Sequence, residues 1–330
     1  MPTIAFEGQE YETEPNESVL DCLSRHGVSV KYSCRSGICQ TCIMMAHEGE
    51  PCEKSQVGLK DVLKAQNYFL ACSCIPKNDL GIGRPNANLV EIDTTVESVD
   101  LLNPEVVRLR LVRPENYQYY PGQYLTLYNS MGVGRSYSIA SIPEEESFLE
   151  LHIRRIPHGQ VSEWVHTELT VGDTVRISGS NGDCFYIPDA QEQSLMLIGT
   201  GTGLAPLYGI AREALRQGHR GPIHLYHGSR TLDGHVTPYG LYLEKELNTL
   251  AQSDDQFFYH PCISRGHVPE NMRQGRANDV ALGDHKCLSG WRIYLCGRED
   301  MVKATKQKAF LAGASLQDIY ADPFVITPSS

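Results

Sequence analysis

Residues 32–42 read Tyr-Ser-Cys-Arg-Ser-Gly-Ile-Cys-Gln-Thr-Cys, and this stretch decides the fold of the first part of the chain. Its cysteines are Cys34, Cys39 and Cys42, and Cys72 completes the C-x4-C-x2-C…C spacing of a four-thiolate [2Fe-2S] site. The small residues between them suit a tight loop whose backbone N–H groups point at cluster sulfurs. The spacing therefore predicts a [2Fe-2S] cluster and one-electron redox chemistry.

The fourth ligand has two candidates, because residues 70–74 read Leu-Ala-Cys-Ser-Cys. Between Cys42 and Cys72 lie 29 residues, and a thiol directly after Leu-Ala resembles the plant-type ferredoxin pattern. We therefore assign Cys72 and keep Cys74 as the alternative ligand. A zinc site is the alternative for the whole set, although the paired C-x2-C…C-x2-C spacing of zinc ribbons is absent.

Length and composition indicate a globular protein of two or three domains, with 330 residues, 41% hydrophobic and 21% charged. The net charge of −11 argues against nucleic-acid binding. Residues 191–330, however, carry equal numbers of acidic and basic side chains, and this balance eases the approach of an anionic dinucleotide. Eleven cysteines without an N-terminal signal-like stretch favour a reducing, cytoplasmic location. Glycines and Pro206 interrupt the apolar residues 193–211, so we expect no membrane span.

The sequence predicts that the chain is divided into three domains. Proline, glycine and asparagine at 76–88 predict a linker and a domain boundary near residue 90. The pattern changes again after residue 190, so we expect domains at 1–90, 91–190 and 191–330. Ser18 predicts the start of a helix over 19–26. Short strands with turn signals predict a small antiparallel barrel, at 106–112, 124–128, 136–140, 148–154 and 174–178. Strands then alternate with helices and predict a doubly wound parallel sheet, at 195–198, 204–216, 223–227, 239–250, 257–262, 292–296 and 301–312.

Residues 135–138, Arg-Ser-Tyr-Ser, lie on a predicted barrel strand and carry groups that suit a flavin. Arg135 can hold a pyrophosphate through charge-assisted hydrogen bonds. Tyr137 can pack against a flat ring, and Ser138 can donate to a flavin nitrogen. Taken alone, the same residues are better explained by one solvated strand residue and two packing side chains.

Residues 158–164 follow, and there Gly159 permits close backbone approach while Ser162 opens a predicted helix whose N-terminus favours phosphate. The order Arg-x-Tyr-Ser and then Gly-x-x-Ser resembles the FAD-binding domain of the ferredoxin-NADP reductase superfamily. The resemblance implies that Arg135 and the second motif hold the pyrophosphate of FAD, and that Tyr137 and Ser138 contact its isoalloxazine. The predicted FAD-binding residues are Arg135, Ser136, Tyr137, Ser138, Ile153, Gly159, Val161 and Ser162.

Residues 199–206, Gly-Thr-Gly-Thr-Gly-Leu-Ala-Pro, follow a predicted strand and open a helix, as a dinucleotide-binding loop does. They resemble the nicotinamide domain of the same superfamily, as do residues 295–301, where the family places its cysteine beside the nicotinamide. For Cys296 the alternative is a merely buried strand thiol. The predicted nucleotide-binding residues are Gly199, Gly201, Thr202, Gly203, Pro206, Ser229, Arg230, Cys296 and Gly297.

Residues 320–324, Tyr-Ala-Asp-Pro-Phe, resemble the end of the family's chains, which implies that Phe324 covers the flavin face that the nicotinamide must reach. Two departures stand out. Residues 233–239 look like an insertion, which leaves the adenosine contacts open. Gln40 stands in the cluster loop where many relatives have glycine.

The motif order, ferredoxin then flavin then nicotinamide, resembles the reductase components of multicomponent bacterial oxygenases. It implies a β-grasp ferredoxin domain, an antiparallel FAD-binding barrel and a doubly wound α/β nicotinamide-binding domain. We expect an oxidoreductase that passes electrons from NADH, through FAD and the cluster, to a protein acceptor, an oxygenase component. Ser138 and Cys296 are its predicted catalytic residues, acting by positioning the reactants.

Three alternatives to this function stay open. The Ser229 and Arg230 pair also suits the 2′-phosphate of NADPH. The acceptor can instead be a pyridoxamine enzyme that forms deoxysugars. A slow redox sensor that signals through its cluster is the third possibility.

Overall fold

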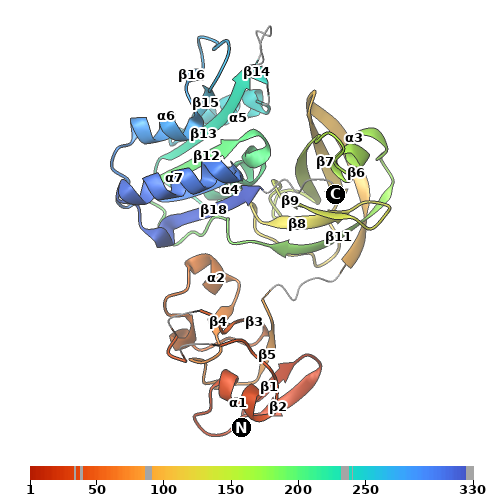
Figure 1. The fold of residues 1–330 in the computed structure, drawn as a ribbon, viewed down its shortest axis with the longest axis vertical. Helices are drawn as coiled ribbons and strands as arrows, with labels where there is room; N and C mark the ends of the chain where they lie inside the picture. The colour runs from red at the N-terminus through yellow and green to blue at the C-terminus, as the bar shows by residue number, and fades with distance from the viewer. Residues whose placement is uncertain (33–34, 38–39, 86–90, 232–237, 240, 325–330) are drawn as a thin grey trace. The chain divides into compact units, whose positions relative to one another are not determined.

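The computed structural model describes residues 1–32, 35–37, 40–85, 91–231, 238–239 and 241–324 (Figure 1). The chain divides into two compact units, Met1–Leu89 and Val90–Ser330. The finer division into domains 1–90, 91–190 and 191–330 remains a prediction.

The N-terminal unit is built on a five-stranded mixed sheet with the order β2-β1-β5-β3-β4. Its strands are β1 (Thr3–Phe6), β2 (Gln9–Glu12), β3 (Ile43–Glu48), β4 (Tyr68–Leu70) and β5 (Leu80–Gly83). Its helices are α1 (Val19–Arg25), the 3-10 helix η1 (Glu53–Gln56) and α2 (Asp61–Ala65). Ile4 and Phe6 of β1 pack with Leu20 and Leu23 of α1 in one apolar core. The arrangement agrees with the predicted β-grasp domain.

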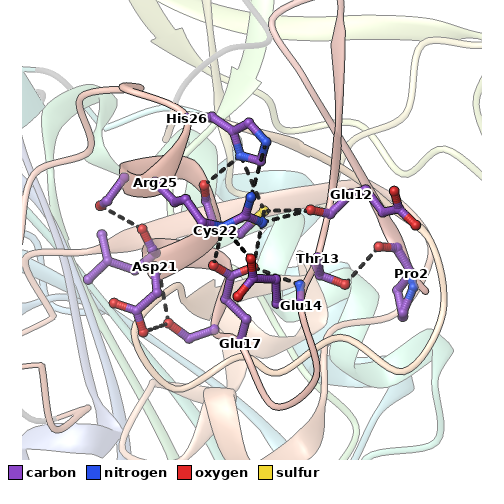
Figure 2. Close-up of polar contacts among 12 residues, drawn as sticks. Pro2, Glu12, Thr13, Glu14, Glu17, Asp21, Cys22, Arg25 and His26 are labelled. Atoms are coloured by element: carbon purple, nitrogen blue, oxygen red, sulfur yellow. Dashed lines mark hydrogen bonds and ion pairs between the residues drawn. The ribbon is translucent and has the colours of Figure 1, made fainter.

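Helix α1 begins after Ser18, as predicted, because the Ser18 hydroxyl accepts a hydrogen bond of 3.1 Å from a backbone N–H in the first turn. Arg25 in the last turn donates to the Glu17 carboxylate at 2.8 Å and to the Glu12 carbonyl at 2.9 Å (Figure 2). The Arg25 guanidinium lowers the pKa of Glu17 to about 2. These contacts tie the helix to the end of β2, and the helix ends one residue earlier than predicted.

The predicted linker at 76–88 is wrong over residues 80–83, which form the buried strand β5 between β1 and β3. A Cβ added to Gly81 would lie 2.8 Å from the Cβ of Glu48 and 3.0 Å from the His47 ring. Glycine is therefore present because the sheet is crowded there, not because the chain is a flexible spacer. Residues 86–88 of the predicted linker lie outside the described residues.

The first part of the second unit is an antiparallel sheet with the order β10-β7-β6-β11-β8-β9. The strands are β6 (Glu91–Asn103), β7 (Val106–Val112), β8 (Tyr124–Tyr128), β9 (Gly134–Ser138), β10 (Phe148–Arg154) and β11 (Thr174–Asn181). A bridge between Ile139 and Leu151 joins the two ends of this order, so the sheet closes into the predicted barrel. Leu109, Leu125 and Ile177 lie in its core, and the short helix α3 (Ser162–Thr167) packs against β10.

Prediction and structure agree over β7, β8 and β10. Strand β9 begins two residues before its predicted start, β11 runs three residues further, and the long strand β6 was not predicted.

The remaining part of the second unit is a parallel sheet with the order β16-β15-β13-β12-β17-β18, and β14 pairs with the end of β13. Its strands are β12 (Leu195–Thr200), β13 (Ile223–Thr231), β14 (Pro238–Tyr239), β15 (Phe257–Ile263), β16 (Arg273–Gln274), β17 (Arg292–Arg298) and β18 (Ile319–Phe324). Its helices are η2 (Gly201–Gly203), α4 (Leu204–Arg216), α5 (Glu244–Ser253), α6 (Ala277–Asp284), α7 (Glu299–Leu311) and η3 (Leu316–Asp318).

Helices cover both faces of this sheet. Helices α6 and α7 share one apolar core with Met196 and Ile198 of β12. On the alternate positions of the same strand, Gly199 lies against Leu207 of α4, so α4 covers the opposite face. The predicted doubly wound architecture is confirmed.

The helix predicted over 239–250 is wrong at its start. Tyr239 belongs to β14, and Leu241 and Tyr242 are buried before the helix α5 begins at Glu244. Leu243 has φ +56°, a left-handed conformation through which a helix does not run. Sequence patterns also did not predict β16, α6 or β18. Within the described residues, no helix has both the length and the apolarity needed to cross a bilayer.

Candidate functional site

A cavity of about 600 Å³ lies in the second unit, with residues of the barrel on one side and the ends of β12 and β18 on the other. The carboxyl ends of parallel strands are the usual place for a nucleotide in such sheets. Most of the predicted flavin-binding residues line this cavity. They are Arg135, Ser136, Tyr137, Ser138, Gly159, Val161 and Ser162.

Strand β9 carries the predicted flavin motif along the cavity. Arg135 is exposed, and Nη1 donates to the carbonyl of Gly134 at 2.8 Å. A Cβ on Gly134 would lie 2.8 Å from side-chain atoms of both Thr126 and Tyr128, so the strand runs close against its neighbour β8. A guanidinium, a tyrosine ring and the Ser138 hydroxyl on one strand supply the charge, flat surface and donor that a flavin nucleotide needs.

The second flavin motif lies where β10 leads into α3. A Cβ on Gly159 would collide with the Ser162 hydroxyl, which accepts a hydrogen bond of 3.1 Å from the Ile156 N–H. The turn therefore depends on glycine and presents the start of α3 to the cavity. Ile153 lies elsewhere, because it is fully buried in the barrel core while its neighbours His152 and Arg154 line the cavity.

The glycine-rich loop follows β12 as predicted, and Thr200 and Thr202 line the cavity. A Cβ on Gly203 would collide with the carbonyl of Cys296, so β17 lies directly against the loop. Pro206 stands in the first turn of α4, where a missing N–H costs no helical hydrogen bond. Backbone N–H groups at the start of this 13-residue helix suit an anionic nucleotide.

Asp322 lies within the motif at 320–324, but it was not among the predicted site residues. In β18 it lies beside Cys296 of β17, and it accepts a hydrogen bond of 3.3 Å from the Ser138 hydroxyl. Burial, together with the nearby charge of Asp183, raises the pKa of Asp322 to about 6, while Ser138 acts to lower it. The two predicted catalytic residues, Ser138 and Cys296, thus both lie beside a carboxyl group whose pKa is raised to about 6.

Cys296 is fully buried, and burial raises the pKa of its thiol, with a further contribution from the neighbouring thiol of Cys184. Burial therefore favours the protonated thiol over the thiolate, which slows its reaction with oxidants. Phe324, the last residue of β18, also lines the cavity.

Ser229 and Arg230 lie near the end of β13, and Arg230 pairs with Tyr239 of β14. Neither is among the residues that line the cavity. Residues 233–237 of the predicted insertion lie outside the described residues.

The cluster loop is only partly described, because Cys34 and Cys39 lie outside the described residues. Cys42 and Cys72 lie close enough for their thiols to share a hydrogen bond. Cys74 is fully buried and its thiol is near Cys52 instead. Among the residues that the structure describes, no three side chains of the ligand types converge as a metal site, and two of the four predicted ligands are not among them.

The loop's backbone fits a tight cluster-binding turn. Gly37 has φ +75°, and a Cβ there would lie 2.7 Å from the Ser73 hydroxyl, so the loop packs directly beside Cys72. Gln40 has φ +57°, the conformation that glycine adopts readily, and its amide donates to the Gly58 carbonyl at 3.0 Å. Gln40 therefore adopts the left-handed conformation that glycine favours, and its side chain is held by Gly58.

Family models match each of the three parts. The 2Fe-2S iron-sulfur cluster binding domain matches residues 3–77, the oxidoreductase FAD-binding domain residues 93–186, and the oxidoreductase NAD-binding domain residues 197–307. The naphthalene 1,2-dioxygenase system ferredoxin–NAD(P)+ reductase component of Pseudomonas putida is 34% identical over 313 residues, 93% of each chain. The chain belongs to the family of iron-sulfur flavoprotein reductase components of oxygenase systems.

Further reductases match this chain over nearly its full length. The reductase subunit of the aromatic O-demethylase of an Amycolatopsis species is 32% identical over 99% of each chain. A crystal structure of an Amycolatopsis cytochrome P450 reductase superposes with a TM-score of 0.67 at 29% identity, covering 98% of this chain and 99% of the other. The ferredoxin reductase in carbazole 1,9a-dioxygenase superposes with a TM-score of 0.64 at 25% identity, covering 98% of each chain.

These findings confirm the predicted enzyme class and cofactors. The reductase is an NAD(P)H-dependent oxidoreductase with FAD-binding, NAD-binding and [2Fe-2S] domains, and its electrons pass from NAD(P)H through FAD to the cluster. Which residues hold each group remains a prediction.

The choice of Cys72 as the fourth ligand is tested by two matched serine variants. We expect Cys72→Ser to lose the cluster and Cys74→Ser to keep it, because Cys72 lies beside Cys42 whereas Cys74 lies beside Cys52. Iron and sulfide content of the purified variants measures this. Equal iron loss in both variants, or zinc in the unmodified protein, would contradict the assignment.

Asp322 predicts a pH dependence of nicotinamide oxidation. An ionised carboxylate favours the positive charge that a nicotinamide ring gains when it gives up hydride, so kcat/KM for NADH is expected to rise as pH increases through about 6. Asp322→Asn should abolish this rise. Ser138→Ala should move the rise to higher pH, because it removes the hydrogen bond that favours the ionised form. An Asp322→Asn profile identical to that of the unmodified reductase would rule the carboxylate out.

Proposed function

We propose that this reductase takes electrons from NADH and delivers them singly, through its cluster, to an oxygenase component. The observation that carries the proposal is the relatives' shared role across nearly the full chain. They are named as reductase components of naphthalene, terephthalate and propane oxygenase systems. When bound, FAD accepts an electron pair from NADH and releases it one electron at a time to the [2Fe-2S] cluster.

On the flavin side, the proposal assigns anion binding to Arg135 and to the start of α3, and ring contact to Tyr137. Their support is that all three line one cavity and that a glycine-dependent turn presents the start of α3 to it. Ser138 holds its hydroxyl toward the reacting face and donates to Asp322. We assign the four cluster ligands as Cys34, Cys39, Cys42 and Cys72.

On the nicotinamide side, Gly201 and Gly203 let the chain turn tightly from β12 into α4, and Gly199, inside β12, leaves room for Leu207. The N–H groups at the start of α4 would hold the phosphates of the dinucleotide. We assign Cys296 and Gly297 to the nicotinamide side of the site. Neither is among the residues that line the cavity, but Cys296 is paired across the strands with Asp322, which does line it. Gly297 has φ +127° and approaches Thr200, so this part of the site is set by backbone rather than by side-chain bulk. Phe324 lies at the end of β18, over the same cavity.

The acceptor is tested with a purified oxygenase component of a naphthalene 1,2-dioxygenase system, the system to which the Pseudomonas putida relative belongs. NADH with the full reductase should sustain substrate oxidation by that component, and the Cys72→Ser variant should lose this coupling while still reducing ferricyanide from its flavin. The Cys74→Ser variant is the matched control and should couple normally. Efficient cytochrome c reduction without any oxygenase turnover would exclude the oxygenase as acceptor, and turnover of a pyridoxamine-dependent sugar enzyme would replace it.

Coenzyme choice is tested at Arg230, which stands at the end of β13, where the 2′ position of the adenosine ribose is read in such folds. We expect kcat/KM to favour NADH, and Arg230→Ala to change NADH use by less than about twofold. The same variant should lower any residual NADPH use by roughly tenfold, which corresponds to one charge-assisted hydrogen bond. A preference for NADPH that Arg230→Ala abolishes would show that NADH was the wrong choice.

A further inference from the structure

Two buried thiols of the second unit lie against each other, and one of them, Cys296, is paired across the strands with the cavity residue Asp322. The sulfur atoms of Cys184 and Cys296 are 3.6 Å apart, and the two residues are 2% and 0% exposed. Cys184 lies between β11 and β12, 112 residues before Cys296 in sequence. None of the flavin, nicotinamide or cluster motifs includes Cys184.

Both backbones are held firmly. The carbonyl of Cys184 fills the space that a Cβ on Gly122 would need. The next residue, Phe185, stacks on Tyr120 with ring centroids 4.4 Å apart, and its carbonyl accepts a hydrogen bond of 3.2 Å from the Tyr294 hydroxyl. On the other side, Cys296 lies inside a parallel strand with its own carbonyl against the glycine-rich loop. The two sulfurs therefore stay opposite each other.

The geometry points to a reversible disulfide between Cys184 and Cys296 that forms under peroxide and stops hydride transfer. This inference rests on the proposed placement of Cys296 beside the nicotinamide. A disulfide has an S–S length of about 2.05 Å, so the sulfurs must approach by about 1.5 Å, within reach of small side-chain rotations. The oxidant is hydrogen peroxide, which reduced flavin generates when it reacts with dioxygen instead of with its partner.

The chemistry balances in two steps. The Cys296 sulfur attacks one peroxide oxygen, the O–O bond breaks, and a sulfenic acid and one water form. The Cys184 sulfur then attacks the sulfenic sulfur, the S–O bond breaks, and the hydroxyl leaves as a second water with the thiol proton. Two electrons pass from the sulfur pair to one peroxide molecule. Burial keeps both thiols from fast reaction, so the pair responds to sustained rather than momentary exposure.

The disulfide acts on the site by moving the Cys296 side chain, which lies beside the cavity residue Asp322. A displacement of about 1 Å at a reacting centre costs up to about 100-fold in rate. Asp322 lies beside Cys296 across β17 and β18, so the change is made next to the carboxylate as well. The cluster ligands take no part, because the pair belongs to the second unit.

The test uses the full FAD-loaded reductase, reduced and then exposed to hydrogen peroxide or to the thiol oxidant diamide. After desalting, the rate of flavin reduction by NADH is measured in a single turnover. We expect at least about a tenfold fall, recovery with dithiothreitol, and unchanged FAD content. Trypsin without reductant should yield residues 177–212 linked to residues 293–298, two hydrogens lighter than the separate peptides.

Two variants sharpen the result. Cys184→Ala should reduce its flavin at the normal rate and resist both oxidants. Cys262→Ala removes another buried thiol of the parallel sheet and should still form the disulfide and lose activity.

Each remaining outcome overturns the inference in a different way. Two alkylated thiols after oxidation show that no disulfide forms. A linked pair with an unchanged rate shows that Cys296 does not face the nicotinamide. Equal inactivation of Cys184→Ala shows damage elsewhere. A reduced, unmodified reductase that fails to accept electrons from NADH contradicts the proposed function itself, independently of the thiols.

Discussion

The carbonyl of Cys296 occupies the space that a side chain on residue 203 would fill, and the rest of the site depends on this contact. It sets β17 directly against the turn between β12 and α4, so the glycine-rich loop lies next to Cys296. Because β18 pairs in register with β17, Asp322 follows beside Cys296. Asp322 in turn accepts from Ser138, and the flavin strand is thereby joined to the nicotinamide strands.

A buried polar network fixes the barrel against the parallel sheet. His152 of β10 contacts the Glu150 carboxylate at 3.0 Å and the hydroxyl of Tyr242 at 3.2 Å, and Arg110 donates to Glu150 at 2.9 Å. Burial acts to raise the pKa of Glu150, but the His152 and Arg110 contacts lower it to about 2. Removing either partner would leave the buried Glu150 carboxylate poorly compensated, which costs folding free energy. The wall of the cavity at His152 is therefore held in place from both sides.

The sequence was informative where function depends on short spacings and silent where it depends on burial. The glycine-rich loop, the flavin strand and the cap at Ser18 were all predicted, because each is a local requirement of a turn or a helix start. The glycines at 81 and 83 were misread as a linker, since composition does not distinguish a flexible spacer from a crowded central strand. No role was predicted for Asp322, because its hydrogen-bond partner Ser138 lies 184 residues away in the sequence and no local pattern connects the two. Ile153 was assigned to the flavin, although strand alternation turns its side chain into the core.

The count of cysteines in this chain says little about their chemistry. The fold places them in three settings: beside the cluster loop, in an apolar core, and facing a second thiol. Cys42 and Cys72 lie together beside a loop whose glycine packs against Ser73, an arrangement suited to sharing a metal cluster. Cys74, two residues further on, is fully buried in the apolar core of this unit with its thiol near Cys52, which supports the assignment of Cys72 as the ligand. Cys184 and Cys296 come from distant segments and face each other where no motif predicts a pair. Long-range packing, which no spacing rule encodes, decides whether a thiol binds iron, fills a core or meets a second thiol.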